Sequence, residues 1–138
     1  MIERRSLRRV SRSIGAVVAG FFATFALSVG TDAVLHAAGV FPAFGQPMSD
    51  LLFVLATVYR TIYTVAGGYI TARLAPDRPM RHAMVLGAIG VAAATAGTVA
   101  TWGRGPEFGP KWYPISLVVL ALPSIWVGAR LWARNVRS

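Results

Sequence analysis

Four apolar stretches of about 20 residues follow one another along the chain, separated by short segments rich in Pro, Gly and charge. A helix rises about 1.5 Å per residue, so about 20 apolar residues cover the roughly 30 Å of hydrocarbon in a bilayer. The pattern therefore predicts an all-α fold, an integral membrane bundle of four transmembrane helices. We expect these helices at about residues 14–39, 51–74, 80–102 and 113–133.

The spacing of these stretches leaves no room for a separate soluble core. We expect one transmembrane domain, residues 14–134, between a basic cytoplasmic N-terminus, residues 1–13, and a cytoplasmic C-terminus, residues 135–138. The first stretch could also be a secretory signal, but the apolar run from Ile14 to Thr31 is longer than a typical signal core. An uncleaved helix is the interpretation we prefer. Pro123 predicts a kink in the last helix.

Basic residues flank the predicted spans unevenly, which predicts orientation because positive loops stay in the cytoplasm. Eleven lie at the two termini and the connection near residue 77, against Arg104 and Lys111 on the opposite side. Both ends are therefore expected in the cytoplasm. Trp102, Trp112 and Tyr113 suit the outer interface.

Composition narrows the classes of function. Apolar residues make up 55% of the chain and charged ones 14%, and the absence of Cys excludes disulfides and thiolate chemistry. The net charge of +9 comes from basic residues at span ends and not from one basic face, so nucleic acid is not an expected partner. The strong excess of Arg over Lys favours a bacterial inner (cytoplasmic) membrane.

Small and polar residues recur at every fourth position in the first two spans, which places them on one face of each helix. In the first span they are Ala16, Gly20, Thr24, Ser28, Asp32 and His36; in the second they are Ala56, Arg60, Thr64, Gly68 and Ala72. Small side chains let membrane helices approach closely. We expect a packing seam that pairs Gly20 with Ala72, Thr24 with Gly68, Ser28 with Thr64 and Asp32 with Arg60.

Asp32 and Arg60 are the charges expected deepest in the membrane, where a lone charge costs at least about 2.5–3.5 kcal/mol. They should face inward and pair. One interpretation is a structural ion pair that sets the register of the two helices. Another is a site for protons or solutes, with Asp32 as carrier and His36 one turn outward as relay. A third is that the first helix ends earlier and Asp32 is solvated.

Sequence motifs of enzymes are absent, and the five acidic residues offer no catalytic pair. His36 and His82 are expected near opposite faces of the membrane, so they cannot share a metal within one chain. A His36 site across an oligomer axis stays open. We expect no enzyme activity and no cofactor.

The third span is rich in Gly and Ala and is expected to be the central helix, whereas the fourth is expected to face lipid more. Near the connection between the second and third spans, Arg73, Arg78 and Arg81 are expected to contact anionic lipid head groups.

The segment 72–79, followed by Arg81, His82 and Ala83, resembles a feature of small four-span membrane proteins of bacteria. The resemblance covers only this hairpin, under a quarter of the chain. It implies the location and the number of spans, and it implies no activity, cofactor or catalytic residue.

Two functions remain open on this basis. The first is a non-enzymatic accessory or interaction subunit, with another membrane protein or a second copy as its partner. The second is a small oligomeric transporter or channel that uses Asp32, His36 and Arg60. The two differ in whether the polar residues of the seam satisfy one another or line a cavity.

Overall fold

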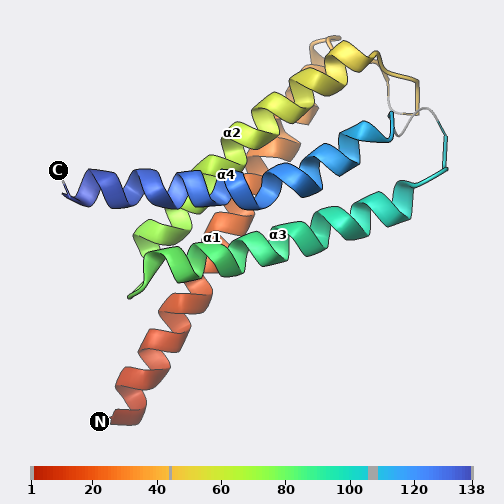
Figure 1. The fold of residues 1–138 in the computed structure, drawn as a ribbon. Coiled ribbons are helices and arrows are strands. Elements are labelled where there is room, and N and C mark those ends of the chain that lie inside the picture. The colour runs from red at the N-terminus through yellow and green to blue at the C-terminus, as the bar shows by residue number, and fades with distance from the viewer. Residues whose placement is uncertain (1, 44, 106–108, 138) are drawn as a thin grey trace.

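The computed structural model describes residues 2–43, 45–105 and 109–137, and every regular element among them is an α-helix. The helices are α1 (Ile2–Ala37), α2 (Asp50–Leu74), α3 (Pro79–Thr101) and α4 (Trp112–Arg137), as Figure 1 shows. All four are long and apolar enough to cross a membrane. The predicted all-helical fold is thus confirmed, and α2 and α3 each begin within a residue of the expected positions.

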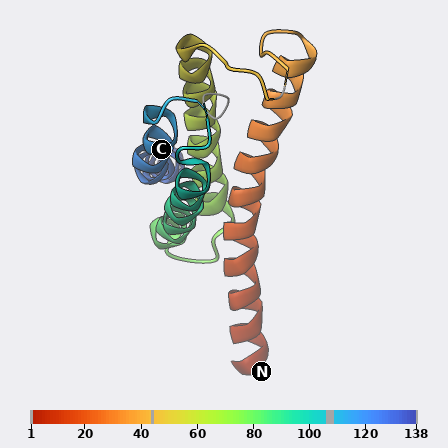
Figure 2. The same ribbon diagram turned by 90° about the vertical axis from the view of Figure 1, so that its right-hand side faces the viewer.

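Helix α1 is longer than predicted, because the basic segment before Ile14 is helical as well. This segment contains no Gly or Pro, and its Arg side chains favour helix. The helix therefore projects past the other three at its N-terminal end (Figure 2). At its other end Gly39 takes φ +77°, and the Val40 N–H donates to the Leu35 carbonyl, which is the bond of a Schellman motif.

Helix α4 also extends beyond the predicted end, to Arg137. Pro123 lies inside it without ending it, and Figure 1 shows the ribbon changing direction near the middle of the helix. A proline inside a helix removes one backbone hydrogen bond and crowds the preceding turn, which explains a bend at this place.

The central helix is α2, which packs most extensively against α4 and also contacts α1 and α3. The expectation that the third span is central was wrong, as was a lipid-facing fourth span. Helix α4 buries a face with a spacing of three and four residues, Ala121, Ser124, Ile125, Gly128 and Ala129. Because most of these side chains are small, α4 can approach α2 closely.

Two apolar clusters hold the helices together. The larger joins three helices through Ala72, Ala83, Leu86, Ile125 and Ala129, with Val17 of α1 packed against it. The smaller contains Phe41, Ala56 and Tyr59 near the connection from α1 to α2. Both termini and the α2–α3 connection lie toward one end of the helices, and the other two connections lie toward the opposite end (Figure 1).

Candidate functional site

An ion pair joins α1 to α2 between the two clusters. The Arg60 guanidinium donates to one carboxylate oxygen of Asp32, and the Tyr59 hydroxyl donates to the other. The side chains of Asp32 and Arg60 are 26% and 29% exposed. The sequence placed these two charges together, and the structure has them in contact. The sequence pattern did not point to Tyr59, which adds a second donor to the Asp32 carboxylate.

Side-chain direction explains how residues on antiparallel helices meet here. Side chains on a helix lean toward its N-terminus, so Asp32 leans back along α1 while Tyr59 and Arg60 lean toward the start of α2. These directions converge because the helices run in opposite senses. The same geometry brings the Tyr63 hydroxyl to 2.7 Å from the Thr31 hydroxyl, one residue before Asp32.

The backbones of α1 and α2 come closest on the far side of the ion pair from the α1–α2 loop. A Cβ on Gly20 would lie 2.7 Å from the Gly67 carbonyl oxygen, and one on Gly67 would lie 2.9 Å from the Gly20 carbonyl oxygen. Thr71 is fully buried and donates to the Ala16 carbonyl at 2.9 Å. Thr24 donates to the Tyr63 carbonyl at 3.3 Å. This is the seam between the two helices.

Of the residues expected in the seam, Gly20 and Thr24 lie at this contact, whereas Gly68 lies elsewhere. A Cβ on Gly68 would lie 2.4 Å from the Ile125 carbonyl oxygen, so Gly68 belongs to the contact between α2 and α4. Ala72 is in the larger apolar cluster with residues of α3 and α4. Adjacent residues on a helix point about 100° apart, and the position that faces α1 is therefore Gly67 and not Gly68.

Two cavities flank the ion pair. The first, which we call the loop cavity, has a volume of about 190 Å³ and lies beside the α1–α2 loop; Asp32, His36, Tyr59 and Arg60 are among its lining residues. His36 shares a hydrogen bond of 2.9 Å with the Pro42 carbonyl through Nδ1, and its ring packs edge-on against Phe41. The structure thus places His36 and Asp32 at one cavity.

The second, which we call the central cavity, has a volume of about 300 Å³ and is lined by all four helices. Ser28, Thr64 and Arg60 border it, so Arg60 lines both cavities. Thr64 donates to the Arg60 carbonyl at 2.7 Å, and Ser28 is buried. Ser28 and Thr64, which the sequence pattern predicts to pair, therefore both lie on the wall of this cavity.

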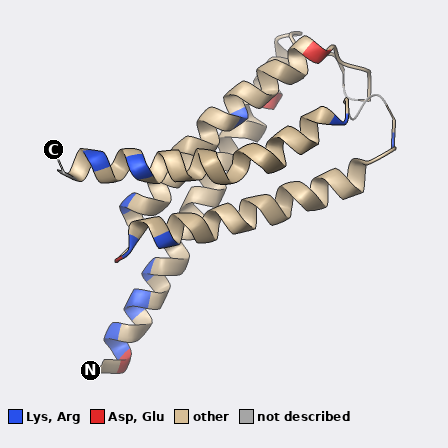
Figure 3. Cartoon of the chain, viewed as in Figure 1, with Lys and Arg blue, Asp and Glu red and all other residues tan. Residues whose placement is uncertain are grey.

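The basic residues near the α2–α3 connection lie at the end of the molecule that also holds both termini (Figure 3). Arg73, Arg78 and Arg81 are exposed. The extended part of α1 is tied to this connection by an Arg9–Asp77 ion pair of 3.5 Å and by a 2.8 Å hydrogen bond between Ser13 and His82. Sequence spacing could not reveal these contacts, because they depend on the unpredicted helical extension of α1.

Chemically, the site offers one carboxylate held by two donors and two cavities lined by hydroxyl and apolar groups. Among the described residues, no three His, Cys, Asp or Glu side chains gather in a way that could hold a metal ion. Comparisons with protein-family models, with curated proteins and with solved structures each give no match.

Proposed function

We propose that the chain is a non-enzymatic, multi-pass protein of a bacterial cytoplasmic membrane that acts as an accessory or interaction subunit. Four helices able to span a membrane support the location. The uneven distribution of basic residues supports cytoplasmic termini. In this orientation Arg73, Arg78 and Arg81 face anionic lipid head groups, each worth about 1 kcal/mol.

The observation that carries the interaction role is a face of α3 that packs on no other helix of the chain. Four exposed alanines follow one another at every fourth residue, Ala88, Ala92, Ala96 and Ala100. Large apolar side chains are exposed on the other helices, as Phe22 of α1 and Val119 of α4 are. Small residues are typical of helix contacts in membranes, because they let a second backbone approach. This face therefore suits a helix of a partner.

Cross-linking through introduced cysteines tests this role, since the chain has no native Cys to interfere. Ala92→Cys and Ala96→Cys, treated in native membranes with an apolar maleimide that carries a photoreactive diazirine and then irradiated, should each give one defined product of higher mass. A product of twice the mass identifies a second copy, and any other defined mass identifies a different subunit. Phe22→Cys on lipid-facing α1 is the matched control and should give none. The same cross-linked products at all three positions would refute the proposal.

The second candidate, an oligomeric transporter or channel, is favoured by the ion pair lying between two cavities. A solute or proton that passes between the loop cavity and the central cavity would have to pass Asp32 and Arg60. Proton flux into vesicles that contain the purified protein and a trapped pH dye is the measurement. This function predicts flux that Asp32→Asn abolishes and Tyr69→Phe preserves, because Tyr69 lines neither cavity. Absence of flux above protein-free vesicles would exclude proton transport.

A further inference from the structure

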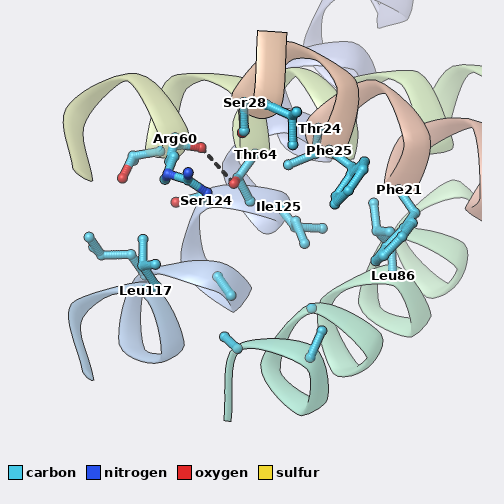
Figure 4. Close-up of a pocket in the computed structure, with 17 residues that line it drawn as sticks. Phe21, Thr24, Phe25, Ser28, Arg60, Thr64, Leu86, Leu117, Ser124 and Ile125 are labelled. Atoms are coloured by element: carbon cyan, nitrogen blue, oxygen red, sulfur yellow. Dashed lines mark hydrogen bonds between the residues drawn. The ribbon is translucent and has the colours of Figure 1, made fainter. Parts of the chain in front are cut away.

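The central cavity has a polar end and an apolar end. Figure 4 shows Arg60, Thr64 and Ser124 at one end and Phe21, Phe25 and Leu86 at the other. The rings of Phe21 and Phe25 are nearly parallel, 7° apart, with centroids separated by 6.4 Å. Small side chains of α3 and α4 leave the space open, among them Gly90, Ala94 and Ala121. Its volume of about 300 Å³ is at the lower end of the range of small-molecule sites.

Two hydroxyl groups at this cavity differ from most others in the helices. Ser and Thr in membrane helices commonly donate to the carbonyl four residues earlier, as Thr57, Thr61 and Ser116 do here. Ser28 and Ser124 are only 4% and 5% exposed, yet neither hydroxyl has a partner among the described residues. Both line the central cavity. A hydroxyl that lines the cavity can donate to, or accept from, a ligand bound there.

Arg60 adds a third polar group. Its Nε is buried and has no hydrogen-bond partner among the described residues, while its Nη2 is engaged with Asp32. Because Asp32 already balances the positive charge, a second carboxylate would leave a net negative charge in a medium of low dielectric constant. The site therefore favours a neutral group that accepts hydrogen bonds.

We propose that the central cavity binds a neutral, lipid-soluble molecule that carries one hydrogen-bond-accepting carbonyl joined to an apolar body. The carbonyl lies among Ser28, Ser124 and Arg60, and the body lies against Phe21 and Phe25. Such a molecule reaches the cavity from the bilayer, so this inference rests on the proposed membrane location. It is independent of the proposed partner at α3, because Ala88, Ala92, Ala96 and Ala100 are not among the residues that line this cavity.

Benzophenone is a suitable probe, because it is neutral, apolar and has one carbonyl that reacts with nearby C–H bonds under ultraviolet light. The purified full-length protein, in vesicles of phosphatidylethanolamine and phosphatidylglycerol, is irradiated with increasing benzophenone, and the labelled peptides are identified by mass spectrometry. We expect saturable labelling within residues 24–29, 60–64 and 117–125. Phenyl benzoate, which has a carbonyl, should compete at least about tenfold better than diphenylmethane, which has none.

Variants distinguish recognition of the carbonyl from simple partitioning of benzophenone into the central cavity. Ser124→Ala should raise the half-saturating benzophenone concentration about fivefold to tenfold, and Ala94→Leu should abolish saturable labelling by filling the cavity. Ser116→Ala, a matched change on the same helix, should have no effect, since that hydroxyl is bonded to the Trp112 carbonyl. Ala92→Leu, which alters only the partner face, should also have none.

The proposal would be overturned if labelling rose linearly with benzophenone concentration and were equal in wild type and Ser124→Ala. That result would show that lipid chains fill the central cavity without selection. Equal competition by phenyl benzoate and diphenylmethane would overturn it as well. A protein that labels as expected but forms no cross-link through Ala92→Cys would refute the partner role and leave the ligand site standing.

Discussion

Arg60 on α2 and Asp32 on α1 form an ion pair at a point where Arg60 borders two cavities. Removing one member leaves the other charge without its partner, whereas removing both leaves neutral groups that can still bond. Removing one partner of a fully buried ion pair costs about 3–5 kcal/mol of stability. We expect Asp32→Asn to cost less than this, because both side chains are about a quarter exposed.

A double-mutant cycle of Asp32→Asn and Arg60→Gln measures this coupling through unfolding in mild detergent. The double variant should be more stable than the sum of the two single changes predicts. Tyr59→Phe, which removes the second donor to the carboxylate, should cost about 1.5–3 kcal/mol. Strictly additive effects of the Asp32 and Arg60 changes would mean that the two residues do not interact.

The close contact between α2 and α4 predicts that glycines there tolerate no side chain. A Cβ on Gly128 would lie 1.9 Å from the Val65 carbonyl oxygen, and backbone atoms cannot move aside as a flexible side chain can. Gly128→Ala and Gly68→Ala should each lower the free energy of unfolding by about 1–3 kcal/mol.

Gly90→Ala is the matched control for these two changes, because the nearest atoms to its Cβ would be 3.8 Å away. Alanine also has the higher helix propensity, so this variant should be neutral or more stable by up to about 1 kcal/mol. If all three variants unfold at the same denaturant concentration, the close crossing of α2 and α4 is incorrect.

The hydrogen bond from Thr71 to Ala16 predicts a difference between two identical substitutions. Thr71→Val keeps the volume but leaves the buried carbonyl of Ala16 without this donor, so we expect a loss of about 1 kcal/mol or more. Thr98→Val removes a bond to a carbonyl of its own helix and should cost less. Thr71→Ser should retain most of the stability. Chemical unfolding of the three variants checks the order.

The topology with both ends in the cytoplasm predicts which introduced cysteines an impermeant maleimide reaches from outside intact cells. Gln46→Cys and Arg104→Cys should be labelled, and Ser6→Cys and Val136→Cys should be labelled only after the membrane is opened. All four positions are exposed, so accessibility to the reagent does not differ between them. Labelling of Val136→Cys in intact cells would contradict this topology.

The sequence by itself determined the number and type of the helices, because the length of an apolar run and the position of Pro and Gly act locally. It also determined that Asp32 and Arg60 should pair, since two isolated charges in apolar helices have few other partners. The residue at which α1 begins could not be predicted in this way. Hydropathy marks where a chain becomes apolar, and the helix itself continues through the basic residues before Ile14.

Only the tertiary structure decided which faces meet. Gly67 and Gly68 are neighbours in sequence with equal propensities, yet one contacts α1 and the other α4. The alanines of α3 and the small residues of α4 look alike as patterns, but α4 packs against α2 while one face of α3 stays open. Small-residue spacing shows that a helix can be approached closely, and the partner is chosen by how all the helices cross. The central cavity depends on those crossings in the same way.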